Sequence, residues 1–560
     1  MQTNLTNLAS TLFKKLFSEA LLQALVILLV CLCLVYLMFR PNVIDYDTST
    51  ALIPAAQTLN GKSQKITETI YANLQNLDED VAQPQTWFPT SYAFFPYIFS
   101  FLEVDSADPL IRLNYGISTT YVIFFILGAL AWIRLLEKIN VSQSHNIYLL
   151  MLFVFLDWSL LNEAIGFLYE WSIVPIALLL SFDFINRRNA LLFVILGGFL
   201  GSLVLFKYSL LVFSISIMIG ILGYFTLLKK VSFANYLASI LSFSLITIFL
   251  ELTIISGNRP GRGVFQNIVE NKIPYLQPIT KWLIDFQSAA LGVPWKLYNT
   301  YLDRSFFDEI VLFFFYISLI YLIFLLVFSS LNNNSRKYSL KDLFFNEEYS
   351  IYTSILITGL LWIFGLTTII IFGNHLGIAP RYFVLPAKLI FIPVLILIAP
   401  ADLNASRKRT MKIVLLMFVC LYSANHISNN YRHFTNVLTD RDNRDFQSRK
   451  LPIFGNFPMM EVEKDKDLIF ISPMPQVLLM LSNYQIGRIY KFDYFKEHLV
   501  ALNENDSADL LKLRFIVPTD PLLFIKKIEE TVPESRGLWL NERIGDSNYF
   551  IVRHSKPNVQ

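Results

Sequence analysis

Charged residues are scarce in this sequence. Asp, Glu, Lys and Arg make up 16% of its 560 residues, whereas a soluble protein of this length carries about a quarter. Hydrophobic residues make up 54% and gather in blocks of about 20, long enough to cross roughly 30 Å of hydrocarbon. The composition excludes a soluble globular protein and indicates a polytopic membrane protein. The net charge of +3 is scattered among loops and gives no indication of a nucleic-acid partner.

Cysteines are also few. The three in the chain are Cys31, Cys33 and Cys420, and all lie in apolar segments. Their spacing excludes a disulfide framework and a zinc site, so they are predicted to be small buried side chains. Lys14 and Lys15 precede the first apolar run, as in a signal peptide. That run is too long for a signal peptide and no small-residue cleavage site follows it, so it is predicted to be a membrane anchor.

The apolar segments predict about eleven membrane-spanning helices. They cover residues 20–39, 113–133, 146–162, 165–184, 190–206, 208–227, 233–255, 308–330, 351–373, 382–400 and 412–429. Basic residues cluster in the connections on one side: Lys14 and Lys15, Arg134 and Lys138, Arg187 and Arg188, Lys229 and Lys230, Arg336, Lys337 and Lys341, and Arg407, Lys408 and Arg409. The positive-inside rule predicts that this side is cytoplasmic. An odd number of spans then puts the N-terminus in the cytoplasm and the C-terminus outside.

This topology divides the chain into two predicted domains. Residues 1–430 form an all-α membrane domain, with a first outer loop at about 40–112 and a further outer segment at about 256–307. In residues 431–560 charged residues return and apolar runs become short. Strands are predicted at 467–472, 487–492, 513–519 and 547–555, and helices at 474–483, 494–503 and 521–532. This alternation predicts an extracytoplasmic α/β domain with a mostly parallel sheet.

Ionisable residues gather at the predicted outer ends of the spans. They are Asp157, Glu170, Lys207, Glu251, His375 and Arg381, and Asp45 and Asp47 begin the first outer loop. Because charges within spans are costly and usually functional, this convergence predicts an active site or a polar permeation path on the outer face. The alternative for a single acid such as Asp157 or Glu251 is a boundary residue that reaches the water. Basic residues of the 256–307 segment are either ordinary long-loop residues or a surface for an anionic lipid headgroup.

The first outer loop has a distinctive spacing. In "IDYDTSTALIPAAQTLNG", Asp47 is followed at helical spacing by Ala55, Leu59 and Gly61. The later segment "TWFPTSYAFFPYIFSFLEV" is rich in proline and aromatic residues. Three more stretches follow in order: "YEWSIVPIALLLSFDFINRR", "GGFLGSLVLFKYSLLVF" and "APRYFVLPAKLIFIPVLIL". They contain Glu170, Lys207 and Arg381, respectively.

Taken together, these stretches resemble the GT-C glycosyltransferases, which use polyprenyl-phosphate sugar donors. The resemblance covers most of residues 20–400. It is greatest to the branch with the protein O-mannosyltransferases and the lipid A aminoarabinose transferases. The sequence departs from that branch at Thr48, where a glutamate is usual, and at Phe88, where a histidine is often found.

The resemblance implies a GT-C membrane fold. It also implies sugar transfer to a lipid, glycan or protein acceptor at the outer face of a bacterial inner membrane. Asp47 is the expected general base, with Asp45 as the alternative. Lys207 and Arg381 are expected to bind the leaving phosphate, one as a point charge and the other as a bidentate fork.

Further candidates have less defined roles. Glu170 is expected either to orient a sugar hydroxyl or to hold Lys207, and Asp157 and His375 are expected to contact substrate. No metal-ligand spacing appears, but some family members bind a divalent ion, so a metal is left open.

Two other functions are weighed against transfer. A transporter or flippase for lipid-linked glycans requires polar groups or broken helices near the midplane, whereas the predicted spans have uninterrupted apolar centres. The second is a non-catalytic envelope protein whose α/β domain binds a partner.

Overall fold

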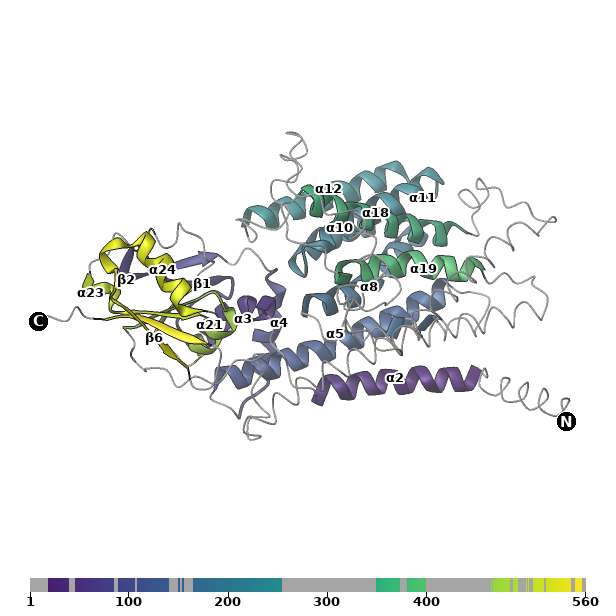
Figure 1. The fold of residues 1–560 in the computed structure, drawn as a ribbon. Coiled ribbons are helices and arrows are strands. Elements are labelled where there is room, and N and C mark those ends of the chain that lie inside the picture. The colour runs from purple at the N-terminus through teal and green to yellow at the C-terminus, as the bar shows by residue number, and fades with distance from the viewer. Residues whose placement is uncertain are drawn as a thin grey trace, which may run out of the picture. The chain divides into compact units, whose positions relative to one another are not determined.

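The structure is a computed structural model (Figure 1). It describes residues 19–39, 46–84, 89–105, 108–139, 150–151, 154–155, 165–253, 349–372, 380–398, 465, 467–483, 487–491, 500, 502, 507–517, 520–544 and 549–555. The chain divides into two compact units. The bundle unit contains Met1–Phe39 and Val122–Asn436, and the sheet unit contains Arg40–Tyr121 and Val437–Gln560.

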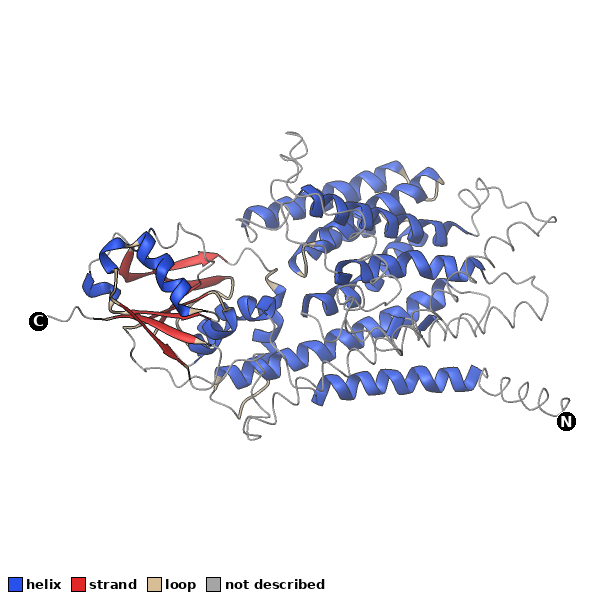
Figure 2. Ribbon diagram, viewed as in Figure 1, coloured by secondary structure: helices blue, strands red, loops and turns tan. Residues whose placement is uncertain are grey.

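The described part of the bundle unit is helical (Figure 2). It contains α2 (Glu19–Phe39), most of α5 (Pro109–Ile139), α8 (Ile165–Arg187), α9 (Ala190–Ser202), α10 (Ser209–Ile217), α11 (Tyr224–Leu227), α12 (Phe233–Thr253), α18 (Ser350–Phe372) and α19 (Val384–Ile398). Short 3-10 helices η1 (Leu203–Leu205) and η4 (Pro380–Phe383) and the π-helix η2 (Met218–Gly223) lie between them.

Five helices in the described part of the chain are long and apolar enough to cross a membrane. They cover Pro109–Ile139, Ile165–Arg187, Ser209–Leu227, Phe233–Thr253 and Ser350–Ile369, and they are compatible with an integral membrane protein. The predicted spans at 308–330 and 412–429, and nearly all of 146–162, lie outside the described residues. The other predicted spans coincide with described helices, and the total number of spans stays a prediction.

Helix α8 is buried along most of its length and packs against α5. The Trp132 indole N–H donates to the carbonyl of Trp171 at 2.9 Å, and the Ser172 hydroxyl donates to the carbonyl of Phe124 at 2.6 Å. Gly128 lets the two helices approach, because a β-carbon there would collide with Trp171 and Ser172. Polar groups at membrane depth have no water to bond, so these bonds fix how α8 faces its neighbour.

The C-terminal part of the sheet unit is a five-stranded sheet. Its strands are β3 (Ile469–Ser472), β4 (Arg488–Lys491), β5 (Leu513–Val517), β6 (Trp539–Arg543) and β7 (Phe550–His554), in the spatial order β4-β3-β5-β7-β6. β3 pairs in parallel with β4 and β5, whereas β7 pairs antiparallel with β5 and β6. Four strands therefore share one direction and β7 opposes them, so the sheet is mixed rather than uniformly parallel.

The predicted elements of this domain are largely present. Strands β3, β4, β5 and β7 lie within the predicted strand segments, and the helices α21 (Pro475–Asn483) and α24 (Pro521–Thr531) lie where helices are predicted. The Asp520 side chain caps α24 by accepting from the amide of Leu522, with Pro521 at the first helical position. A short helix α23 (Ser507–Leu510) and the strand β6 are not predicted, and the predicted helix at 494–503 lies largely outside the described residues.

The first loop folds onto this sheet. It forms α3 (Tyr46–Leu59), the antiparallel hairpin of β1 (Glu68–Asn73) and β2 (Asn76–Pro84), and α4 (Ser91–Ser100). In Figure 1 the purple hairpin lies beside the yellow strands. Ala72, Leu74 and Leu77 share one hydrophobic core with strand residues that include Leu513 and Phe515. The first loop and the C-terminal tail are therefore one folded unit, which the sequence analysis does not predict.

Helix α3 is tied to both halves of this unit. The buried Gln57 side chain donates to the carbonyl of Ile70 at 2.9 Å and accepts from the amide of the same residue at 2.8 Å, which joins α3 to β1. The Asn60 amide donates to the carbonyl of Ser482 at the end of α21, at 2.9 Å. Because α3 also packs along α21, its orientation is set by the C-terminal domain.

Candidate functional site

A buried ion pair joins two of the predicted site residues. Lys207 Nζ lies 2.6 Å from Glu170 Oε2, and the two side chains are 8% and 4% exposed. The hydroxyl of Ser209 donates to the other carboxylate oxygen of Glu170. Of the two roles predicted for Glu170, the structure therefore supports the one in which it holds Lys207.

The backbone around Lys207 explains its position. Helix α9 tightens into η1, and α10 begins at Ser209, so Lys207 lies at the junction between two helices. The amide of Lys207 donates to the carbonyl of Leu203, and the carbonyl of Lys207 accepts from the amide of Leu210. The junction directs a charged side chain toward α8, where Glu170 lies in the second turn.

Aromatic rings enclose the ammonium group of Lys207. Its Nζ lies 3.1 Å from the centroid of the Phe167 ring and 5.2 Å from that of Tyr382, and the two rings are 5.6 Å apart in an edge-to-face arrangement. A cation over an aromatic face is attracted by the ring, and the attraction is stronger where water is excluded. Phe167 is one turn before Glu170 on α8, so one helix supplies both the anion and the first ring.

Tyr382 brings a third predicted site residue, Arg381, to this place. It belongs to η4, which also contains Arg381 and leads directly into α19. The backbone that carries Arg381 therefore lies beside the Lys207–Glu170 pair, although the Arg381 side chain is outside the described part.

The other predicted residues are not brought to this cluster by any described contact. Asp47 lies in the first turn of α3, in the sheet unit, with only its backbone described. Asp45, Asp157 and His375 lie outside the described residues. Their roles stay predictions.

Three residues near the site are not singled out in the sequence analysis. Ser209 stands two residues after Lys207 in "FKYS", and Tyr382 directly follows Arg381 in another quoted stretch. Phe167 lies three residues before Glu170, just outside the quoted stretches. The only sequence pattern that could have indicated them is their closeness to a charged residue. That closeness alone does not distinguish an aromatic ring that covers a cation from an ordinary core side chain.

Lys388 is a further buried residue that was not predicted. It lies in α19, is 1% exposed, and its ammonium donates to the carbonyl of Val154 at 3.3 Å. The predicted span at 382–400 therefore has a buried lysine in its interior, and the expectation of uninterrupted apolar span centres is wrong there. A buried lysine within a predicted span is a candidate for function.

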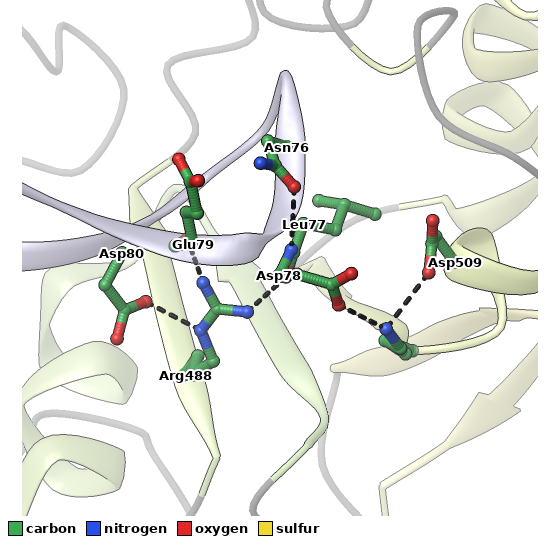
Figure 3. Close-up of polar contacts among 8 residues, drawn as sticks. Asn76, Leu77, Asp78, Glu79, Asp80, Arg488 and Asp509 are labelled. Atoms are coloured by element: carbon green, nitrogen blue, oxygen red, sulfur yellow. Dashed lines mark hydrogen bonds and ion pairs between the residues drawn. The ribbon is translucent and has the colours of Figure 1, made fainter.

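A second polar cluster lies within the sheet unit and joins the β1–β2 hairpin to the C-terminal strands (Figure 3). Arg488 Nε lies 2.6 Å from Asp80 Oδ1, and the same guanidinium group donates to the carbonyls of Leu77 and Glu79. Lys512 Nζ lies 2.8 Å from Asp78 Oδ1 and 3.0 Å from Asp509 Oδ1. We call these contacts the hairpin clasp.

The clasp changes the ionisation of its members. The hydrogen bond from Lys512 lowers the pKa of Asp78, and the hydrogen bonds to Asp78 and then Asp509 raise the pKa of Lys512. Both shifts favour the charged forms that make the contact.

Metal binding is left open by this geometry. In the described ranges, no three residues among His, Cys, Asp and Glu lie together in a group that could hold a metal ion.

Comparison with protein-family models and with curated proteins finds no match for this chain.

Proposed function

We propose that this protein is an integral-membrane glycosyltransferase. It moves a sugar from a polyprenyl-phosphate donor to a lipid, glycan or protein acceptor at the outer face of a bacterial plasma membrane. The observation that carries the proposal is the buried Lys207–Glu170–Ser209 cluster, with the segment that contains Arg381 beside it. A buried ion pair contributes little net stability compared with apolar packing, which favours a functional reason for its presence.

In the proposed reaction, an acceptor hydroxyl oxygen attacks the anomeric carbon of the donor sugar. A carboxylate takes the hydroxyl proton as the new carbon–oxygen bond forms, and the electron pair of the old bond leaves on the phosphate. Asp47 is the proposed base, with Asp45 as the alternative. Asp47 lies in the first turn of α3.

Cations are needed where negative charge develops on the departing phosphate. Lys207 and Arg381 are proposed for this task. Glu170 and Ser209 act as positioning residues, because together they fix the ammonium of Lys207 at the junction of η1 and α10. Asp157 and His375 remain proposed substrate contacts, and a divalent metal remains open.

The C-terminal domain has a structural part in this proposal. It holds α3 through α21 and the bond from Asn60 to Ser482, and it holds the hairpin, to which Gln57 joins α3, through the clasp. Such fixation would keep Asp47 in one place during transfer, because proximity and orientation are large contributions to rate.

The test is sugar transfer by the purified full-length chain in liposomes that contain a polyprenyl-phosphate sugar. The donor and acceptor would first be identified by mass spectrometry of envelope glycans with and without the chain. Asp47→Asn should abolish transfer while donor binding persists, and Asp105→Asn, at an exposed position, is the matched control. Full transfer by the Asp47→Asn and Asp45→Asn variants would refute the proposed base, and unchanged envelope glycans would refute the proposed function.

A transporter or flippase for lipid-linked glycans is the second candidate function. Lys388 favours it, because translocation pathways place ionisable groups at membrane depth. The π-helix η2 within the α10–α11 span is a local irregularity of the kind often found at functional sites. Movement of the lipid across liposomes without sugar transfer, lost in Lys388→Met, would favour this candidate over the transferase.

A further inference from the structure

Helix α4 and the turn that follows it, Phe101 and Leu102, expose an apolar face. No residue from Ser91 to Leu102 is charged, and Phe94, Ile98, Phe101 and Leu102 are each between 41% and 59% exposed. Their spacing of four, seven and eight residues from Phe94 places them on one side of a helix. The opposite side is buried and includes Tyr92, Ala93, Pro96 and Ser100.

This helix is fixed to the beginning of α5, which is long and apolar enough to cross a membrane. A β-carbon at Gly116 would collide with the carbonyl oxygen of Pro96, so the two helices touch at that point. The Arg112 guanidinium lies 5.1 Å from the centroid of the Phe101 ring, and its Nε donates to the carbonyl of Ser100 at 3.5 Å. These contacts are on either side of residue 113, where hydropathy predicts that the span begins.

The exposed face therefore belongs to a short helix held at the end of a membrane span. Aromatic side chains are enriched at that level of a bilayer, where rings lie between headgroups and acyl chains. The charged residues that follow α4 are acidic, namely Glu103, Asp105 and Asp108. Attraction to anionic lipids is thus excluded as the main force that holds this face to a membrane. Apolar contact with the lipid is then the main force.

We propose that α4 lies at the interface between membrane and water on the outer side of the plasma membrane. Its exposed residues Phe94, Ile98, Phe101 and Leu102 are inserted among the lipid acyl chains. The inserted helix anchors the first loop of the sheet unit to the membrane surface. This inference does not depend on the proposed function, since a transferase and a transporter would both use such an anchor.

The experiment measures the depth of a fluorescent label. Cys31, Cys33 and Cys420 are replaced by alanine, and Ile98→Cys is labelled in the full-length chain in phosphatidylcholine vesicles. The matched control is Gln75→Cys, at the exposed turn of the β1–β2 hairpin. Quenching is measured with nitroxides attached near the headgroup end of the acyl chain and with iodide in the water.

The proposal predicts that the lipid nitroxide quenches the label at position 98 several-fold more than the label at position 75, with the reverse order for iodide. Adding anionic lipid should leave both results unchanged. Iodide access at position 98 equal to that at position 75 would overturn the proposal. Protection of position 98 from both quenchers would also overturn it, since a protein surface such as a second copy of the chain would then cover α4.

Discussion

The ammonium group of Lys207 lies over the ring of Phe167 at 3.1 Å from its centroid, while Glu170, one turn further along α8, accepts its hydrogen bond. The lysine therefore has an anion and an aromatic face on the same helix. The pair could have a structural role or a phosphate-binding role, and substitution distinguishes the two. A purely structural pair can be replaced by apolar residues, whereas a phosphate-binding lysine cannot.

Removing one partner of this pair should destabilise the bundle. Lys207→Met leaves the Glu170 carboxylate buried without its cation, and breaking a buried pair in this way costs about 3–5 kcal/mol. Thermal unfolding in detergent should show the loss. The double variant Lys207→Met/Glu170→Leu should recover most of the stability, because no uncompensated charge remains.

Activity should separate from stability in the same variants. If Lys207 binds the leaving phosphate, sugar transfer should stay lost in the double variant even though its stability recovers. A double variant with normal transfer would instead show that the pair only joins α8 to α10.

The hairpin clasp predicts unequal effects for its two basic residues. Arg488 makes an ion pair with Asp80 and two further bonds to backbone carbonyls, and its side chain is 16% exposed. Arg488→Ala should therefore weaken the hairpin by about 1–3 kcal/mol. Lys512→Ala, which removes the more exposed contact to Asp78, should weaken the hairpin much less.

Hydrogen exchange along β1 and β2 measures this difference. Faster exchange is expected throughout the hairpin in Arg488→Ala, and near-normal exchange in Lys512→Ala. Equal protection in both variants would show that the shared core of Leu74 and Leu77 holds the hairpin without the clasp.

The buried side chain of His554 should make the sheet unit less stable in acid. The side chain is 4% exposed and packs edge-to-face on Trp539, and within the described ranges neither ring nitrogen has a hydrogen-bond partner. Burial lowers the pKa of His554 below its ordinary value of 6.5, so the unfolded chain binds a proton more readily than the folded one. Stability is complete above about pH 6.5 and falls by at most about 1.4 kcal/mol per pH unit as the pH drops toward the folded pKa.

Denaturation of the sheet unit between pH 8 and pH 5 tests this, with hydrogen exchange along β6 and β7 as the signal. His554→Phe should remove the acid-dependent loss in this window. An unchanged pH dependence in that variant would assign the loss to another group.

Much of the bundle was predictable because its signals are local. Apolar length and one-sided basic residues indicate the helices. Glu170 was singled out by its depth within a span, and Lys207 by its place in the short link between two spans. Ser209 was within a quoted motif, but only packing shows that its hydroxyl reaches the same carboxylate. Lys388 was missed because a single lysine hardly lowers the hydropathy of an apolar segment.

The sheet unit was less predictable, because its contacts join segments that are far apart in the sequence. The bond between Arg488 and Asp80 joins residues 408 positions apart, and no local pattern in either segment specifies the other. Strand β6 was missed because only Trp539 of its five residues is buried, so the segment lacks an apolar run. The first loop was interpreted as a loop for a related reason, since strand β2 buries only one side chain, Leu77, and that side chain needs the C-terminal core.

The packing of α9 on α12 gives a last prediction. Gly197 and Gly201 lie one turn apart on α9, and Ser239 of α12 donates from its hydroxyl to the carbonyl of Phe193 at 2.8 Å. A β-carbon at Gly197 would collide with the carbonyl oxygen of Ser239, and one at Gly201 would lie 2.8 Å from the carbonyl oxygen of Phe243. Helices in membranes associate through such small residues, because close backbone approach replaces the hydrophobic driving force.

Gly197→Ala should therefore separate the helices and lower the unfolding temperature in detergent. Gly198→Ala is the matched control on the same helix, since its β-carbon would lie 3.3 Å from the Ser242 hydroxyl and 3.7 Å from Ile246 Cγ1, with no backbone atom so close. It should be neutral, or should stabilise by up to about 1 kcal/mol through the higher helix propensity of alanine. Because α9 leads through η1 to Lys207, Gly197→Ala should also reduce sugar transfer more than Gly198→Ala does. Equal unfolding temperatures for the two variants would show that α9 and α12 can part at that point without cost.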